Sequence, residues 1–320
     1  MSFPVAMVDV SIVIVNWNVR DLLRRCLHSI TQYPAFSLEV IVVDNASTDG
    51  SVDMVRAEFP AVRLVVNSEN RGFPGAINQG ISLARGRYVL LLNPDTELVG
   101  NALGTMVAFA DEHSDVGVVG PQLLNSDGSV QSSRRRFPTL ATAFFESTWL
   151  QPYAPRRLLE WYYVNDQPDD RVQGVDWLMG AALMARRGAI ERVGSMDERF
   201  FMYSEELDWC RRFREAGWRV VYLPTAQVLH HEGKSSEQVL PARHIHFQTS
   251  KVRYFRKYHG YVAAEALRLF LLGSYVWQLG LEGAKWLVGH RRSLRAGRVA
   301  AYWQVLRSGL RQSGVSRRDG

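Results

Sequence analysis

The sequence predicts an α/β protein with a Rossmann-like, mostly parallel sheet flanked by helices and a helical appendage at the C-terminal end. Through the first hundred residues, short apolar runs alternate with segments of helical apolar spacing. This alternation favours βαβ units with right-handed crossovers. Tyr88 to Leu92 is an unbroken apolar run that is too short for a free-standing helix. Such a run is typical of a strand buried on both faces of a parallel sheet.

These two patterns place the elements along the chain. Strands are predicted at 10–15, 39–44, 61–66, 88–92, 116–120, 175–186 and 219–223. Helices are predicted at 20–30, from the end of the 45–50 loop to about residue 59, and at 76–84, 100–112, 188–193 and 205–216. Asn125 to Gly128 has the residues of a hairpin turn, and Pro224 is expected to close the last strand. The segment 139–173 is interpreted as an insertion-like or mobile segment.

The composition is that of a globular protein. A chain of 320 residues with 47% hydrophobic content can bury one large core, or one core and an appendage. The two cysteines, Cys26 and Cys210, have no CxxC spacing, which argues against a disulfide scaffold and a zinc site and fits a reducing compartment. The first nine residues have neither the basic start nor the apolar run of a leader. We therefore expect a cytoplasmic protein.

The C-terminal region differs from the rest of the chain. From about residue 261 to 312 it contains long helical segments with clustered aromatic residues and leucines. Its longest uncharged run, 269–281, is too short to span a bilayer core of about 30 Å. The last thirty residues hold eight arginines and one aspartate. We expect a catalytic domain at 1–258 and a basic amphipathic region at 259–320 that lies on the inner, anionic face of the cell membrane. Its basic residues include Lys285, His290, Arg291, Arg292, Arg295 and Arg298.

Polar side chains follow three of the predicted strands. Asn16 to Asn18 follow the first strand, Asp44 ends the second, and Asn93 to Asp95 follow the fourth. Parallel strands bring their carboxyl ends to one edge of the sheet, where open α/β sheets bind ligands. Turn residues after strands are also common for purely structural reasons. The three together favour a cation or phosphate site, with Asp44 placed to accept the imide N–H of a uracil or thymine ring.

Two further clusters carry acids and histidines. In the segment 204–212, Glu205, Glu206 and Asp208 stand in the first helical turn, where the helix dipole alone would favour them. Adjacent carboxylates beside aromatic residues also provide a candidate general base. His230 and His231 follow the last strand and precede Gly233. Neutral imidazole joins carboxylates readily on divalent ions, so either histidine is a candidate ligand.

The order of these motifs resembles family 2 glycosyltransferases with the GT-A fold, and most of all their bacterial rhamnosyltransferase branch. The motifs are Asp44, then 70–73 (NRGF), 93–95 (NPD), 200–212 and 230–235. The resemblance runs from about residue 10 to 258. Its most specific part is 196–211, MDERFFMYSEELDWCR.

The resemblance implies a role for each matching residue. Asp44 is implied to bind the nucleobase, and Asp95, at the last position of the family's DxD motif, a divalent cation, Mg or Mn. Glu206 matches the second acid of the family's Glu-Asp pair, the usual base, and His230 a histidine that helps to hold the metal or diphosphate. The donor-binding residues implied are Asn16, Asn18, Asp44, Asn70, Arg71, Gly72, Asn78, Asn93 and Asp95.

Two residues depart from the family pattern. Asn93 stands where DxD has its first Asp, so the metal has one carboxylate fewer. Glu206 is one methylene longer than the commoner Asp, so the base role can be shared with Glu205 or shifted to it.

These observations predict an inverting, nucleotide-sugar-dependent glycosyltransferase. The expected reaction moves rhamnose from dTDP-rhamnose onto a hydroxyl of a lipid-linked glycan in cell-wall or polysaccharide biosynthesis. The alternatives are a UDP-sugar donor on the same fold and an inactive membrane adaptor. A nucleotidyltransferase is disfavoured, because Asn16-Trp17-Asn18 does not resemble a Gly-rich phosphate loop. Nucleic-acid binding by the basic tail is disfavoured, because its aromatic residues fall on helical stripes beside leucine.

Overall fold

The computed structural model describes residues 8–31, 37–231, 240–289 and 291–311. The chain forms two compact units. The first unit comprises Met1–Phe137, Glu160–Phe201 and Glu205–Ser235, and the second comprises Pro138–Leu159, Met202–Ser204 and Ser236–Gly320. Every site residue predicted above lies in the first unit. The predicted domain boundary after residue 258 stays a prediction.

The first unit alternates strands and helices along the chain. Its elements are β1 (Val10–Asn16), α1 (Arg20–Thr31), β2 (Leu38–Asp44), α2 (Ser51–Glu58), β3 (Arg63–Val66), α3 (Gly72–Leu83), β4 (Tyr88–Leu92), β5 (Thr96–Val99), α4 (Ala102–Glu112), β6 (Val116–Leu124), β7 (Val130–Gln131), β8 (Arg134–Arg135), β9 (Gln173–Val175), β10 (Trp177–Leu178), β11 (Ala182–Arg186), α7 (Arg187–Val193), α8 (Glu205–Glu215) and β12 (Arg219–His230).

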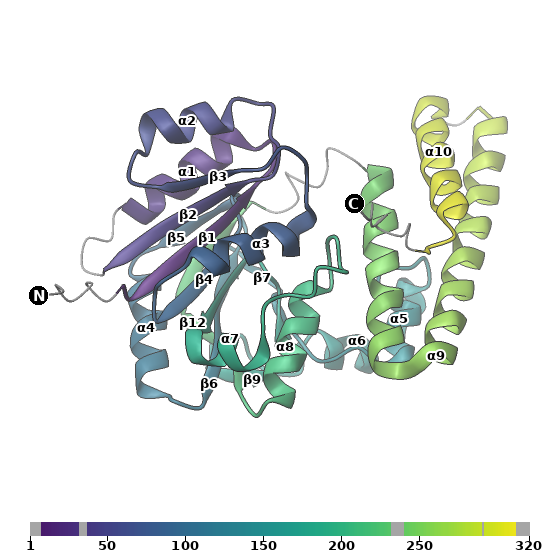
Figure 1. Cartoon of the computed structure of the whole chain (residues 1–320). Helices are drawn as coiled ribbons and strands as arrows, with labels where there is room; N and C mark the ends of the chain where they lie inside the picture. The colour runs from purple at the N-terminus through teal and green to yellow at the C-terminus, as the bar shows by residue number, and fades with distance from the viewer. Residues whose placement is uncertain (1–7, 32–36, 232–239, 290, 312–320) are drawn as a thin grey trace, which may run out of the picture. The chain divides into compact units, whose positions relative to one another are not determined.

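One large sheet is the frame of this unit (Figure 1). Its strand order is β3-β2-β1-β4-β11-β6-β12-β5, with β7 beside β6 and β9 beside β12. The strands β3, β2, β1 and β4 are mutually parallel, as the sequence predicts. Beyond β4 the sheet is mixed, because β11 runs antiparallel to both β4 and β6. The carboxyl ends of β1, β2 and β4 therefore share one edge.

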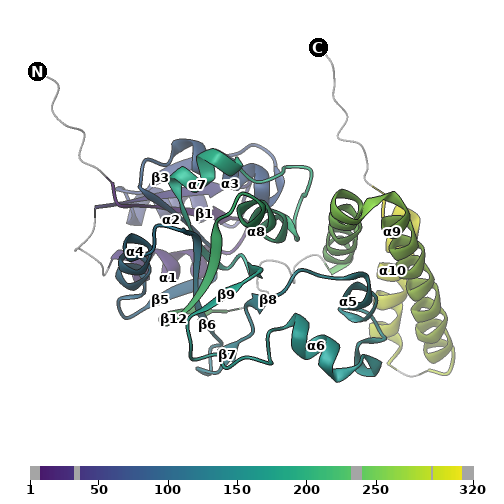
Figure 2. The ribbon, with the colours of Figure 1, turned by 90° about the horizontal axis from the view of Figure 1, so that it is seen from below.

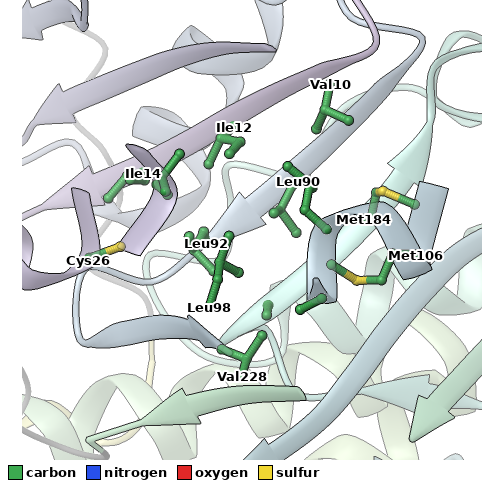
Figure 3. Close-up of a cluster of buried hydrophobic side chains, with 14 of the residues drawn as sticks. Val10, Ile12, Ile14, Cys26, Leu90, Leu92, Leu98, Met106, Met184 and Val228 are labelled. Atoms are coloured by element: carbon green, nitrogen blue, oxygen red, sulfur yellow. The ribbon is translucent and has the colours of Figure 1, made fainter. Parts of the chain in front are cut away.

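Helices cover both faces of the sheet and create two cores. Alternate residues of β1 point to opposite faces, as the period of a strand requires. Ile12 and Ile14 pack with residues of α1, α2 and α4, and Val13 and Val15 pack with residues of α3, α7 and α8. Figure 2 shows α3, α7 and α8 over one face, and Figure 3 shows part of the core on the opposite face, including Ile12, Ile14, Leu90 and Leu92. The five residues of β4 are all buried, so the prediction that this strand is covered on both faces is confirmed.

Several predicted elements differ from the structure in form or in bounds. The expected strand at 175–186 is three short strands, because residues 179–181 leave the ladder: Met179 N–H donates to Ser133 O and Ala181 O accepts from Asn93 N–H. Pro224 does not close the last strand. β12 continues to His230, and the register with β6 shifts between Leu223 and Gln227, which accommodates a proline without an N–H. Helix α3 starts at Gly72 rather than at residue 76.

The second unit is helical. It contains α5 (Leu140–Phe145), the 3-10 helix η1 (Gln151–Tyr153), α9 (Leu240–Leu287) and α10 (Arg292–Ser308), and α6 (Arg156–Tyr162) continues into the first unit. Gly260, with φ of 85°, interrupts α9. Helices α9 and α10 are tied by the Arg295–Glu282 ion pair and by a 2.9 Å bond from Arg268 to Gly309 O. A helical C-terminal region was predicted and is found, whereas the insertion-like segment 139–173 contains regular helices. Among the residues described, no helix combines the length and apolar character that crossing a membrane requires.

Candidate functional site

The ends of β1 and β2 meet in a buried polar pair. Asn16 and Asp44 are register partners, and Asn16 Nδ2 donates to Asp44 Oδ2 over 2.8 Å. The other oxygen of Asp44 accepts from the backbone N–H of Ser47 at 2.8 Å. Asn16 Oδ1 is buried without a hydrogen-bond partner among the described residues. A buried acceptor left unpaired costs free energy, so this atom is a candidate contact for an N–H group of a ligand.

Asn18 belongs to the same loop. Its backbone has φ of 53°, in the left-handed region that asparagine tolerates better than most residues. Asn18 Oδ1 accepts from Thr48 N–H at 2.7 Å, and its own N–H donates to Ser47 Oγ at 3.0 Å. These hydrogen bonds therefore join the loop after β1 to the loop after β2, next to the Asn16–Asp44 pair.

Asn45 attaches the loop before α3 to the two loops after β1 and β2. Sequence reasoning did not identify Asn45 as a site residue. Asn45 is buried, and its Nδ2 donates to Asn70 Oδ1 at 2.9 Å and to Gly72 O at 3.1 Å. Its Oδ1 accepts from Arg71 N–H at 3.1 Å. The side chain of Arg71 is exposed. The predicted donor-binding residues 70–72 are thus held by Asn45, next to Asp44, through the Asn70 side chain and the backbone of Arg71 and Gly72, while the Arg71 side chain is left accessible.

Gly72 and Asn78 position this loop against the segment 196–201. Gly72 has φ of 74°, and a Cβ there would lie 2.6 Å from Phe201 O, so only glycine fits. Both polar ends of the Asn78 amide bind the main chain of Met196, at 2.9 and 3.0 Å. Asn78 was predicted to bind the donor. Its side chain holds the segment that leads into α8, and its role in donor binding stays a prediction.

The turn after β4 is fixed by its backbone. Asn93 O accepts from Thr96 N–H at 3.3 Å and from Thr96 Oγ1 at 2.7 Å, and Cys26 Sγ lies 3.6 Å away. The side chain of Asn93 makes no hydrogen bond to another described residue and is partly exposed. Asn93 therefore shapes the turn through its main chain and presents its amide at the edge of the sheet.

Asp95 and His230 form a buried pair at this edge. Asp95 Oδ1 lies 3.5 Å from His230 Nε2, and both side chains are about 95% buried. Asp95 Oδ1 has no hydrogen-bond partner among the described residues. His230 Nδ1 is bound to Gln131 Oε1 at 2.7 Å. The sequence predicted this pairing of a carboxylate and an imidazole, and the structure brings the two residues together.

His231 faces a different set of groups. Its Nε2 lies 2.7 Å from Glu97 Oε1, and its Nδ1 lies 2.9 Å from Ser126 Oγ. Its backbone N–H donates to Asp95 O at 2.9 Å. Both ring nitrogens of His231 are engaged, whereas His230 directs one nitrogen at Asp95. Of the two histidines left open by the sequence, His230 is therefore the better candidate ligand.

The Asp95–His230 pair suits a divalent cation. A carboxylate oxygen without a hydrogen bond and an imidazole nitrogen face each other, and both donor types bind Mn²⁺ and Mg²⁺ or related ions. Three or more His, Cys, Asp or Glu side chains that could hold a metal do not gather anywhere in the part of the chain that the structure describes. The protein would supply two ligands and a bound substrate the others, as is common for Mg²⁺ on phosphates.

Glu205 and Glu206 open helix α8 after an unusual turn. Tyr203 and Ser204 both have positive φ values, 69° and 64°. Such conformations are costly for residues other than glycine and are concentrated at functional sites. One carboxylate oxygen of each glutamate is buried without a hydrogen-bond partner among the described residues. Asp208 is instead paired with Arg212 at 3.0 Å, so that the third acid of the segment has a structural partner.

The surroundings of Glu205 and Glu206 act differently on the pKa values of the two carboxyl groups. Burial, and then the charge of Glu206, raise the pKa of Glu205 well above its ordinary value of 4.5. Burial also raises the pKa of Glu206, but the nearby backbone N–H groups of Glu206, Gly180 and Leu207 favour the charged carboxylate and oppose the rise. The backbone N–H groups therefore favour the ionised form of Glu206, and burial beside that charge favours the protonated form of Glu205. Neighbouring carboxyls with separated pKa values can serve as one base and one neutral acid.

A short loop connects the base candidate to the metal candidate. Gly180 packs against the Glu206 side chain, since a Cβ built on Gly180 would lie 3.5 Å from Glu206 Cβ and 3.6 Å from its Cγ, and Ala181 O accepts from Asn93 N–H at 2.8 Å. Two consecutive residues thus join α8 to the turn before Asp95. Sequence reasoning missed this loop, because Gly180 was interpreted as the centre of a continuous strand. It also missed Gln131, for which a two-residue strand carries no signal beyond the adjacent hairpin turn.

Comparisons with known proteins identify the family. The family model described as "Glycosyl transferase family 2" matches residues 11–170. A curated N-acetylglucosaminyl-diphospho-decaprenol L-rhamnosyltransferase of Mycobacterium tuberculosis is 31% identical over 82% of this chain and 89% of its own length. The succinoglycan biosynthesis protein ExoO of Rhizobium meliloti is 28% identical over 64% of this chain and 69% of its own.

Solved structures share the fold. A mannosyltransferase of Pyrobaculum calidifontis, solved with GDP-Man and Mn²⁺, matches with a TM-score of 0.56 and 20% identity, over 96% of this chain and 86% of its own. GalNAc-T7, solved with UDP, GalNAc and Mn²⁺, matches with a TM-score of 0.55 and 14% identity, over 78% of this chain and 50% of its own. The predicted GT-A fold class is confirmed by these glycosyltransferase neighbours. The chain belongs to glycosyl transferase family 2 and is a glycosyltransferase.

Proposed function

We propose that this chain transfers rhamnose from dTDP-rhamnose to a hydroxyl of a lipid-linked glycan, with inversion at the anomeric carbon. The observation that carries the proposal is the connection of Glu206, through its packing contact with Gly180 and the bond from Asn93 N–H to Ala181 O, to the turn that bears Asn93 and Asp95. It ties a carboxylate with base character to a candidate diphosphate-metal position. The name of the M. tuberculosis relative supports the choice of sugar and of a diphospho-polyprenol acceptor.

The donor would lie along the carboxyl edge of β1, β2 and β4. The unpaired Asn16 Oδ1 and the carboxylate of Asp44 offer acceptors for the imide N–H of thymine. Asn18 and the backbone of residues 70–72 close the nucleoside pocket, and the exposed Arg71 guanidinium suits a phosphate. Asp95 and His230 would hold a divalent cation that, when bound, offsets the negative charge developing on the leaving diphosphate.

The proposed chemical step depends on the protonation of Glu205 and Glu206. Ionised Glu206 accepts the proton of the acceptor hydroxyl while that oxygen attacks the anomeric carbon. The bond from this carbon to the diphosphate breaks, and dTDP leaves with the electron pair. Attack on the face opposite the leaving group inverts the configuration. Glu205, which keeps its proton, limits the negative charge beside the base and can donate a hydrogen bond.

A donor screen tests this function. Purified protein is heated with dTDP-rhamnose, UDP-sugars or GDP-mannose, each with and without Mn²⁺. We expect dTDP-rhamnose with Mn²⁺ to raise the melting temperature most, because a ligand that binds only the folded state stabilises by mass action. A polyprenol-diphospho-GlcNAc acceptor should then receive rhamnose with opposite anomeric configuration. A larger shift with a UDP-sugar would reassign the donor, and the absence of any shift or transfer would favour an inactive adaptor.

We also propose that α9 and α10 bind an anionic membrane surface on the cytoplasmic side. Trp277, Trp286 and Trp303 are 54%, 43% and 55% exposed, and Val262, Leu287 and Val288 are more than 70% exposed. Lys285, Arg291, Arg292 and Arg298 are exposed on the same two helices or the turn between them, while Glu282 is held by Arg295. Exposed aromatic and aliphatic side chains beside basic residues suit an interfacial helix. His290, also part of the sequence prediction, lies outside the described residues.

Vesicle flotation tests the membrane proposal. We expect the protein to float with vesicles containing anionic lipid, and to float less with neutral vesicles or at high salt. Replacing Trp277, Trp286 and Trp303 together by serine should abolish flotation. Trp161→Ser, in the first unit and 37% exposed, is the matched control and should float like the wild type. Equal flotation of the triple variant and the wild type would remove α9 and α10 from membrane binding.

A further inference from the structure

The β6–β7 hairpin carries a chain of hydrogen bonds that ends on His230. Gln131 links the ring to the hairpin: its Oε1 lies 2.7 Å from His230 Nδ1, and its Nε2 donates to Asn125 Oδ1 at 3.0 Å. Asn125 Nδ2 donates to Ser129 Oγ at 2.9 Å, and Ser129 Oγ donates to Asp127 Oδ1 at 2.6 Å. Gln131 and His230 are both buried, at 7% and 6% exposure.

The carboxylate at the end of this chain determines the direction of every bond in it. An ionised carboxylate can only accept, so the single hydroxyl proton of Ser129 points at Asp127. Donation from Ser129 keeps the pKa of Asp127 below its usual range. The Ser129 oxygen must then accept from the Asn125 amide nitrogen, which turns Asn125 Oδ1 toward Gln131. Gln131 must in turn present its amide nitrogen to Asn125 and its oxygen to the imidazole.

The orientation of Gln131 decides which nitrogen of His230 carries the proton. An amide oxygen accepts only, so Nδ1 of His230 is the N–H donor. In the neutral imidazole the other nitrogen, Nε2, then has a free lone pair. That nitrogen is the one facing Asp95 Oδ1 at 3.5 Å. With the opposite tautomer, an N–H group would stand between the two candidate ligands and block a cation.

We propose that Gln131 is a positioning residue that holds His230 in the Nδ1–H tautomer and so prepares its Nε2 to bind a divalent cation together with Asp95. The inference rests on the proposed function for the cation site alone and not on the identity of the sugar. Some groups orient a metal-binding histidine by bonding to its second nitrogen. Removing such a group typically lowers metal affinity about 10-fold to 100-fold. The hairpin is in this way a part of the site, because it orients a ligand of the proposed cation.

The chain offers a matched control for Gln131. Gln122 is equally buried at 7% exposure, and its amide is also fully used, donating to Tyr222 Oη at 3.0 Å and accepting from Gln227 at 3.0 Å. Gln122→Leu therefore removes a buried amide from the same sheet without touching His230. Gln131→Leu removes the acceptor of the imidazole proton. Gln131→Glu keeps an acceptor at that place and serves as the conservative rescue.

Two measurements on the protein without donor test the proposal. The first is the ¹⁵N NMR spectrum of the His230 ring at pH 8.5, which distinguishes the tautomers, with His230→Gln used to assign the signal. The second is Mn²⁺ binding by titration calorimetry. We expect the wild type, Gln122→Leu and Gln131→Glu to show the Nδ1–H tautomer and similar Mn²⁺ affinity. Gln131→Leu should show a mixture of tautomers and Mn²⁺ binding weakened about 10-fold or more.

The outcomes separate the inference from the proposed function. A pure Nδ1–H tautomer in Gln131→Leu, or Mn²⁺ affinity equal to that of Gln122→Leu, would overturn the role of Gln131. A selective loss in Gln131→Leu that Gln131→Glu restores supports it, whether or not rhamnose is the sugar transferred. If Gln131→Leu does not fold, Gln131→Met takes its place, because its side chain has nearly the same length and no amide oxygen to accept from Nδ1–H, and the same two outcomes decide.

Discussion

Glu206→Gln is expected to lower sugar transfer about 10²-fold to 10⁴-fold, the range that a positioned general base contributes. The glutamine keeps the size of the side chain and its packing against Gly180, but it cannot take the proton of the acceptor hydroxyl. Donor binding should survive, because the predicted donor contacts come from β1, β2, β4 and their loops. The measurements are initial rates of transfer and the thermal shift with donor, both compared with the wild type.

Two further variants make this test specific. Glu215→Gln, at the far end of the same helix and paired with Arg211 at the surface, should transfer at the wild-type rate. Glu205→Gln should retain most of the activity, because Glu206 is the proposed base and burial favours the protonated form of Glu205, which cannot act as one. Unchanged turnover in Glu206→Gln together with a large loss in Glu205→Gln would move the base to Glu205.

The pH profile gives an independent signature of the same base. Since burial raises the pKa of Glu206, the rising limb of kcat against pH should lie above the ordinary range of a glutamate. Activity is then lost as the pH falls through this raised pKa, because protonated Glu206 cannot act as base. The limb should persist in Glu205→Gln and disappear from the residual activity of Glu206→Gln.

Asp95→Asn is expected to abolish stabilisation by Mn²⁺ and to lower transfer by about 10²-fold or more, because a metal Lewis acid supplies several kcal/mol of charge stabilisation. Asp95 is the one carboxylate of the proposed cation site, and its Oδ1 has no hydrogen bond to another described residue. The variant keeps the shape of the side chain, so the turn after β4 should remain intact. Mn²⁺ calorimetry and metal-dependent transfer rates measure the effect.

The reverse substitution at Asn93 sharpens this test. Asn93→Asp adds the second carboxylate of a DxD motif at a partly exposed position and should tighten Mn²⁺ binding about 10-fold. Glu97→Gln, two residues beyond Asp95 and bound to His231, is the nearby control and should retain Mn²⁺ affinity. Full activity of Asp95→Asn without metal would mean that the cation lies elsewhere or is not needed, with the sugar transfer itself unaffected.

Most of the fold could be predicted from local patterns. Buried runs such as Tyr88 to Leu92 and the helical spacing of 20–30 are signals within one segment, and both elements are found where predicted. The misplaced elements are those whose form depends on distant partners. Residues 179–181 leave the ladder because Ser133 and Asn93 take their backbone groups, and β12 passes Pro224 because β6 pairs with it on both sides of the shift.

The sequence by itself determined the fold class, the family, and the individual acids, amides and histidines of the candidate site, because residue types and their order are local properties. Only the tertiary structure decided their partners. It paired Asp44 with Asn16, used Asn78 to hold Met196, chose His230 over His231 to face Asp95, and brought Gln131 to the imidazole. These contacts join residues 28 to 135 positions apart, and their geometry follows from strand register and sheet order, which no short segment encodes.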